Sequence, residues 1–108
     1  MIVYTDLMIF PKAEATTWGP FIFIRPRSRG DEGLLAHEQV HVRQWKRNPF
    51  MFVPYLLSKK ARLKYEAEAY AEQAKHHPDR MAAFARALAT QYRLGISEDD
   101  ALKAILDA

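Results

Sequence analysis

Two histidines four residues apart, with a glutamate directly after the first, are the side chains of this sequence best suited to chemistry. They are His37, His41 and Glu38, in the stretch HEQVH. On a helix, side chains at positions i and i+4 lie on one face, so both imidazoles can present a ring nitrogen to a single ion. The HExxH pattern is typical of zinc hydrolases. We therefore predict that His37 and His41 are ligands of Zn²⁺ and that Glu38 is catalytic.

The predicted chemistry depends on the water that a catalytic zinc keeps beside its three protein ligands. Zinc lowers the pKa of that water from about 15.7 to roughly 7, and Glu38 stands where it could take the proton. The alternative is that the spacing arises by chance, with one histidine hydrogen-bonded in the core and the other exposed.

A helix over residues 31 to 47 would position this motif. Asp31 is a suitable N-cap, Glu32 is favourable in the first turn, and Asn48-Pro49 ends the helix. At about 100° per residue, the basic residues of this segment share one arc and the motif lies on the opposite one. The motif therefore points toward the interior or a cleft, which favours a genuine site over a chance match.

A zinc site of this type needs a third protein ligand, and the chain contains no cysteine. A second helical segment, Ala61 to Lys75, offers two glutamates. Glu68 belongs to a charged stripe that is typical of a solvated face. Glu66 falls instead beside the apolar arc, where an unpaired carboxylate would be costly. We predict that Glu66 is the third ligand.

Other assignments remain open for these side chains. Glu66 could be a buried carboxylate paired with Arg43, Arg62 or a tyrosine hydroxyl. The remaining histidines, His76 and His77, lie at a helix end, and we interpret them as exposed turn residues away from Glu66.

The chain resembles the gluzincins, which are HExxH metallopeptidases with a glutamate ligand on a later helix, and in particular their smallest single-domain members. The resemblance covers roughly residues 18 to 72 and is carried by three segments: Phe21–Arg25, Leu34–Trp45 and Tyr65–Tyr70. It implies a zincin-like fold, zinc as cofactor and hydrolysis of peptide bonds. It also implies that His37, His41 and Glu66 hold the zinc, and that Glu38 is the general base and acid.

One position departs from the gluzincin pattern. Many gluzincins have an aspartate four residues after the ligand glutamate, which holds the other nitrogen of the first histidine, and such contacts tune a metal site. This chain has Tyr70 at that position. We expect the Tyr70 hydroxyl or a backbone carbonyl to take this role. Tyr55 or Tyr70 could also support the oxyanion during catalysis.

The composition is that of a compact protein, with 108 residues, 49% apolar and 27% charged, and we expect one zincin-like domain over residues 1–108. A chain of this length should fold without a metal, which favours a catalytic zinc over a structural one. The lack of cysteine excludes disulfides and gives no sign of an oxidising compartment. Residues 1–10 lack a basic start and contain Asp6, unlike a signal peptide. We expect a cytoplasmic protein.

The most apolar stretch, Pro49 to Leu57, is far shorter than the roughly 20 residues that a membrane span requires, so we expect no transmembrane segment. We interpret it as a short helix or helical loop that covers the core between the two ligand helices, in preference to a patch that contacts a membrane. The net charge is only +3, and the basic residues from Arg25 to Arg29 alternate with proline and serine. We therefore expect a solvated loop there and no binding of nucleic acid.

The predicted architecture is α+β. It has a small antiparallel sheet of two or three strands, drawn from residues 2 to 10 and 20 to 25, followed by four or five helices, with zinc between the first and the third. Later helices are predicted from Pro78 to about Tyr92 and after Ser97. We expect Phe21 to Arg25 to be an edge strand that takes an extended peptide by β-augmentation.

These observations lead to a zinc metallopeptidase acting on a peptide or protein substrate, with a partner protein as one source of specificity. A non-catalytic metal-binding or protein-interaction domain that retains the zincin frame is the alternative, and solvent access to Glu38 separates the two. A third hypothesis is a small accessory protein without a metal.

Overall fold

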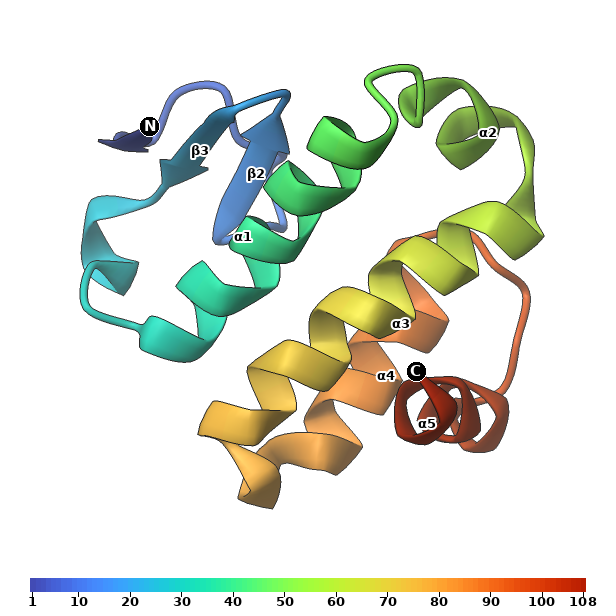
Figure 1. Cartoon of the computed structure of the whole chain (residues 1–108). Coiled ribbons are helices and arrows are strands. Elements are labelled where there is room, and N and C mark those ends of the chain that lie inside the picture. Colours follow the sequence, from blue (N-terminus) through green and yellow to red (C-terminus); the bar gives the residue numbers. More distant parts are fainter.

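The computed structural model describes residues 1–108 as a three-stranded sheet followed by five α-helices (Figure 1). The strands are β1 (Ile2–Tyr4), β2 (Ala15–Trp18) and β3 (Phe21–Ile24). The helices are α1 (Glu32–Arg47), α2 (Phe52–Leu57), α3 (Lys59–His76), α4 (Met81–Gln91) and α5 (Glu98–Asp107), with short 3₁₀ turns at Pro26–Ser28 and Pro78–Arg80. This arrangement confirms the α+β class predicted from the sequence.

The sheet has the order β1-β3-β2, so β3 is the central strand. β2 runs antiparallel to β3, whereas β1 runs parallel to it, and the sheet is therefore mixed rather than purely antiparallel. The prediction that Phe21 to Arg25 is an edge strand is wrong, because β3 is hydrogen-bonded on both sides. The edge strand that contacts α1 is β2, a strand that was not predicted from the sequence.

Side-chain caps set where the two long helices begin. The Asp31 carboxylate accepts a hydrogen bond from the backbone N–H of Leu34 at 3.0 Å, as its predicted role as N-cap of α1 requires. Ser58 caps α3 in the same way, with its Oγ 3.1 Å from the backbone nitrogen of Ala61. α3 therefore begins two residues before the predicted start at Ala61.

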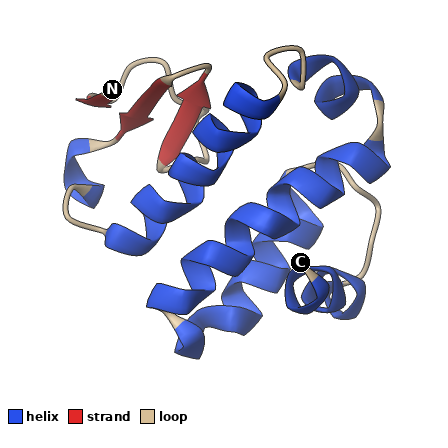
Figure 2. Ribbon diagram, in the orientation of Figure 1, coloured by secondary structure: helices blue, strands red, loops and turns tan.

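Helix α1 lies between the sheet and the other helices (Figure 2). Its sheet-facing side contributes Leu34, Leu35 and Val42 to a small apolar cluster with Ile22 and Ile24. Its other side packs along α3. A second and larger apolar cluster lies among α3, α4 and α5 and contains Tyr70, Ala74, Phe84, Leu88 and Ile105. The inward face of α1 therefore meets α3 between the two apolar clusters.

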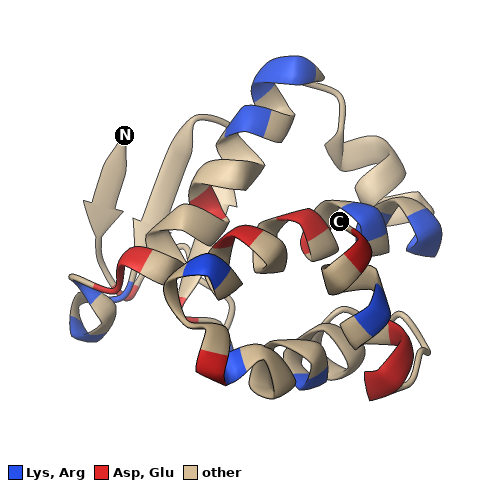
Figure 3. Ribbon diagram, turned by 60° about the horizontal axis from the view of Figure 1, so that its bottom comes forward, with Lys and Arg blue, Asp and Glu red and all other residues tan.

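Helix α2 forms where the sequence predicted a short helix, but it does not cover the core. It contains no buried residue, and Phe52, Val53, Leu56 and Leu57 are all exposed. The reason is that α2 packs mainly against α3, and no other element lies over its outer side. Figure 3 shows α2 without charged residues, between basic residues at the end of α1 and at the start of α3. None of the helices combines the length and apolar character needed to cross a membrane.

Candidate metal centre

The three side chains predicted to bind zinc meet between α1 and α3. His37 and His41 lie one turn apart on α1, and Nε2 of each faces the same oxygen, Oε1 of Glu66 on α3. The two distances are 3.3 Å for His37 and 3.2 Å for His41. One potential ligand atom from each residue lies within 4.8 Å of the other two. His37 and Glu66 are buried and His41 is partly buried, so this cluster could hold a metal ion away from bulk water.

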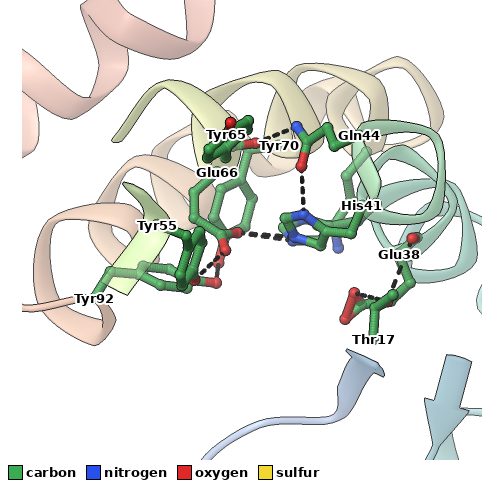
Figure 4. A network of polar contacts seen from close by, with 11 residues as sticks. Thr17, Glu38, His41, Gln44, Tyr55, Tyr65, Glu66, Tyr70 and Tyr92 are labelled. Atoms are coloured by element: carbon green, nitrogen blue, oxygen red, sulfur yellow. Dashed lines mark hydrogen bonds and ion pairs between the residues drawn. The ribbon is translucent and has the colours of Figure 1, made fainter. Parts of the chain in front are cut away.

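The orientation of His41 is set by Gln44, which is buried on the next turn of α1. Gln44 Oε1 lies 2.9 Å from Nδ1 of His41, and Gln44 Nε2 donates to the backbone carbonyl of Tyr65 at 3.0 Å (Figure 4). Because that second bond fixes which end of the amide is the donor, Oε1 must accept from Nδ1–H of His41. The neutral ring then carries its lone pair on Nε2, which is the form that binds a metal.

His37 is held in a similar way by Gln73. Its Nδ1 lies 2.9 Å from Oε1 of Gln73, a buried side chain on α3 two turns beyond Glu66. Gln73 therefore takes the role that we expected from the Tyr70 hydroxyl or a backbone carbonyl. The Tyr70 ring instead packs edge-on against the His37 ring, with centroids 4.5 Å apart. Its hydroxyl turns toward the C-terminal helices and lies 2.9 Å from that of Tyr92.

The second oxygen of Glu66 is bound by Tyr55. The Tyr55 hydroxyl, on α2, donates to Oε2 of Glu66 at 2.5 Å (Figure 4). A tyrosine partner was one of the alternatives to a metal role for Glu66. In the structure, Glu66 has a tyrosine partner and two histidine neighbours at once, because Tyr55 binds Oε2 and both imidazoles face Oε1. The two arginines considered as partners lie elsewhere: Arg43 is exposed, and Arg62 donates to the carbonyl of Tyr92.

The electrostatics favour an ionised Glu66. Burial alone would raise the pKa of Glu66, but the two imidazoles hold it well below its ordinary value. Burial lowers the pKa of His41, yet the adjacent carboxylate outweighs this and raises it above the ordinary value. Burial and the same carboxylate raise the pKa of Tyr55, which keeps its proton and remains a donor. A buried carboxylate with two imidazole nitrogens is a donor set that fits a divalent cation, which would replace the imidazolium charge.

Glu38 lies on the side of α1 that faces the sheet and is not one of the three clustered ligand groups. It is 5% exposed, and its Oε2 accepts a hydrogen bond from the Thr17 hydroxyl at 3.2 Å (Figure 4). The same hydroxyl lies 3.4 Å from the backbone carbonyl of Glu38. Thr17 belongs to β2, so this strand fixes the carboxylate beside the histidines.

The remaining candidates lie outside the cluster. Glu68 pairs with Arg47 at 3.0 Å on the surface of the helix pair. His77 lies at the N-terminal end of α1, where its Nε2 is 3.4 Å from the Asp31 carboxylate.

Sequence reasoning missed the roles of Gln44, Gln73 and Thr17. The available signal for each glutamine was its place on the inward face of a predicted helix. Gln44 lies three residues after His41, and Gln73 lies seven residues after Glu66. Nothing in the local sequence marked Thr17, because its short strand had not been predicted.

Comparison with known proteins adds one partial match. The model of the eCIS core domain family matches residues 9–49, which include β2, β3, α1 and the HEQVH stretch, but end before Glu66. No curated protein and no solved structure matches the chain. The similarity therefore covers less than half of the chain and includes two of the three clustered side chains.

Proposed function

We propose that this chain is a zinc-dependent metallopeptidase whose zinc is held by His37, His41 and Glu66. The observation that carries the proposal is the convergence of three shielded ligand atoms, with both imidazole Nε2 atoms directed at one carboxylate oxygen. Two histidines and a glutamate are the protein ligands of a well-known class of catalytic zinc sites. The resemblance to the gluzincins supports the same reading.

Glu38 acts as general base and then as general acid. Zinc at this site would polarise a substrate carbonyl and lower the pKa of a water molecule. Glu38 takes the proton of that water and returns it to the leaving amine, a role suited to a carboxylate next to the histidines. The Thr17 hydroxyl occupies only Oε2 of Glu38, which leaves Oε1 for proton transfer.

The two tyrosines have different roles in this proposal. Tyr55 supports the oxyanion, because its hydroxyl already reaches into the centre and keeps its proton. Its bond to Glu66 must be exchanged for one to the substrate when the reaction proceeds. Tyr70 acts as a positioning residue, since its ring packs on His37 while its hydroxyl is bound to Tyr92.

The peptide substrate binds along β2 rather than along Phe21 to Arg25. β2 is an edge strand, and Thr17 on it contacts Glu38. An extended peptide that adds to this edge by main-chain hydrogen bonds would pass beside Glu38.

A non-catalytic metal-binding domain is the second candidate, and one observation favours it. Glu38 and His37 are each only 5% exposed, so a substrate needs the local structure to open before it can reach them. In that case the same three ligands bind a metal, and the protein acts through its surfaces.

The test combines metal content with hydrolysis. Protein purified without chelator or affinity tag is assayed for zinc and for cleavage of a denatured protein, alongside Glu38→Gln. The proposal expects one equivalent of zinc in both proteins and cleavage by the wild type alone. Equal cleavage by both would refute the role of Glu38. Zinc without any cleavage would favour the non-catalytic candidate, and no zinc after reconstitution would exclude both.

A further inference from the structure

The outer side of α2 and the turn before it form an exposed apolar surface, which we call the α2 face. It consists of Phe50, Phe52, Val53, Leu56 and Leu57, and Phe50 and Leu57 are 72% and 82% exposed. Isolated apolar side chains are common on protein surfaces, but five within eight residues form a contiguous patch of the kind that marks an interaction site. The predicted role of this stretch as a cover for the core does not explain them, because their side chains point away from it.

The charge of the surrounding segment is strongly one-sided. Residues 39–65 contain seven of the sixteen lysines and arginines and none of the thirteen acidic residues. This quarter of the chain therefore carries a formal charge of +7, whereas the rest carries −4, which together give the net charge of +3. The modest net charge hides this segregation.

Basic residues precede and follow the α2 face along the chain. Figure 3 shows basic positions on the two helix ends that adjoin α2. Lys46 lies in the last turn of α1, and Lys59 and Lys60 lie in the first turn of α3. All three are exposed, and none has a carboxylate within 4.0 Å. Arg47 differs, because it pairs with Glu68. The three lysines are therefore free to contact an external negative charge.

We propose that the α2 face binds the surface of a membrane that contains anionic lipids. Its apolar side chains enter the boundary between headgroups and acyl chains, and the flanking lysines contact the lipid phosphates. Neither signal is strong alone, but apolar insertion and attraction to anionic lipid add in free energy. A protein partner fits this surface less well, since lysine is depleted in protein interfaces. The binding is peripheral, because α2 has only 6 residues.

This surface lies next to the candidate metal centre. Tyr55 also belongs to α2. It is half-buried on the inner side of this helix, and its hydroxyl donates to Glu66. A membrane bound to the outer side of α2 would thus lie one helix away from the centre. The inference does not depend on catalysis, because it rests on exposure and charge alone.

Vesicle sedimentation tests the proposal with the full chain. The vesicles are phosphatidylcholine alone, or phosphatidylcholine with phosphatidylglycerol. We expect the wild type to pellet with the mixed vesicles, more weakly with the neutral ones, and less as salt rises. Lys59→Gln with Lys60→Gln should weaken binding about 25-fold, at roughly fivefold for each lysine. Phe52→Ser with Leu56→Ser should weaken it at least about tenfold, since two apolar side chains no longer insert.

The matched controls are substitutions on α5, which is distant from α2 along the chain. Leu106→Ser and Lys103→Gln change an exposed apolar and a basic residue on α5, and both should bind as the wild type does. Circular dichroism of each variant checks that it is folded. Glu38→Gln should also bind vesicles normally. Absence of wild-type binding at low salt, or equal binding by the α2 variants and the wild type, would overturn the proposal. A wild-type dimer that dissociates in Phe52→Ser, without vesicle binding, would assign the face to a second copy instead.

Discussion

Gln44 connects α1 and α3, the two helices of the candidate metal centre, because one end of its amide accepts from His41 and the other donates to the carbonyl of Tyr65. The distances are 2.9 Å and 3.0 Å, and the residue is 1% exposed. Tyr65 directly precedes Glu66, so a single buried amide sets both the ring orientation of His41 and the backbone position beside Glu66. The site is thus organised by hydrogen bonds that do not involve a metal.

Gln44→Leu should weaken zinc binding by about 10- to 100-fold, which is the usual effect of removing a side chain that orients a ligand. It should also destabilise the fold by about 1–3 kcal/mol, because the Nδ1–H group of His41 loses its acceptor and the Tyr65 carbonyl loses its side-chain donor. Competition with a chromophoric chelator measures the first effect and urea unfolding the second. Gln39→Leu, at an exposed position of the same helix, is the control. Equal affinity in the two variants would contradict the assigned role of Gln44.

Glu66→Ala should lose stoichiometric zinc, whereas Glu68→Ala should retain it. Both substitutions remove a carboxylate from α3, but only Glu66 faces the histidines, and Glu68 pairs with Arg47. Elemental analysis of the two purified variants checks this. Loss of zinc from both, or from neither, would show that the three-residue cluster is not the metal site.

Thr17→Val should lower kcat while leaving zinc content unchanged. The hydroxyl of Thr17 holds the Glu38 carboxylate in place. If loss of this hydrogen bond raises the activation free energy by about 1 kcal/mol, turnover should slow by roughly five- to tenfold. Thr16→Val, on the same strand, is a matched control, because the Thr16 hydroxyl is buried without a partner. That variant should be neutral or more stable, as a buried polar group without a bond is removed. A kcat for Thr17→Val equal to that of the wild type would rule out this positioning.

Glu14 should make a small, pH-dependent contribution to stability. Hydrogen bonds from Arg27 and Ser28 lower the pKa of Glu14 from 4.5 to about 2. A carboxylate whose pKa is depressed by folding stabilises the native state above its unfolded pKa, and this contribution is lost as pH falls through its folded value. Glu14→Gln should therefore be less stable than the wild type at pH 7, with the gap closing between about pH 4.5 and 2.

The difference in free energy of unfolding between Glu14→Gln and the wild type should remain below about 1 kcal/mol. The reason is that the Glu14 side chain is 40% exposed and water screens its pair with Arg27. Urea unfolding at several pH values gives the comparison. Glu98→Gln, whose carboxylate lies 3.7 Å from Arg86, is the control for loss of a surface pair. A gap for Glu14→Gln that is unchanged down to pH 2 would contradict the predicted linkage.

The features that depend on helical periodicity could be predicted from the order of residues alone. The i, i+4 spacing placed His37 and His41 on one face, and the same reasoning separated Glu66 from the surface residue Glu68. The Asp31 cap was readable because its hydrogen bond reaches only three residues along the chain. Such features are local, so neighbouring residues are enough to specify them.

How these elements meet depends on contacts between segments that are distant in the chain. Gln73 reaches His37 across 36 positions, and Thr17 reaches Glu38 from a strand whose partner could not be read from its own four residues. Strand order depends on pairing between segments, which made β3 central and β2 the edge. The exposure of α2 likewise depends on whether another element covers it. An apolar run shows that burial is favourable, but not what is available to bury it.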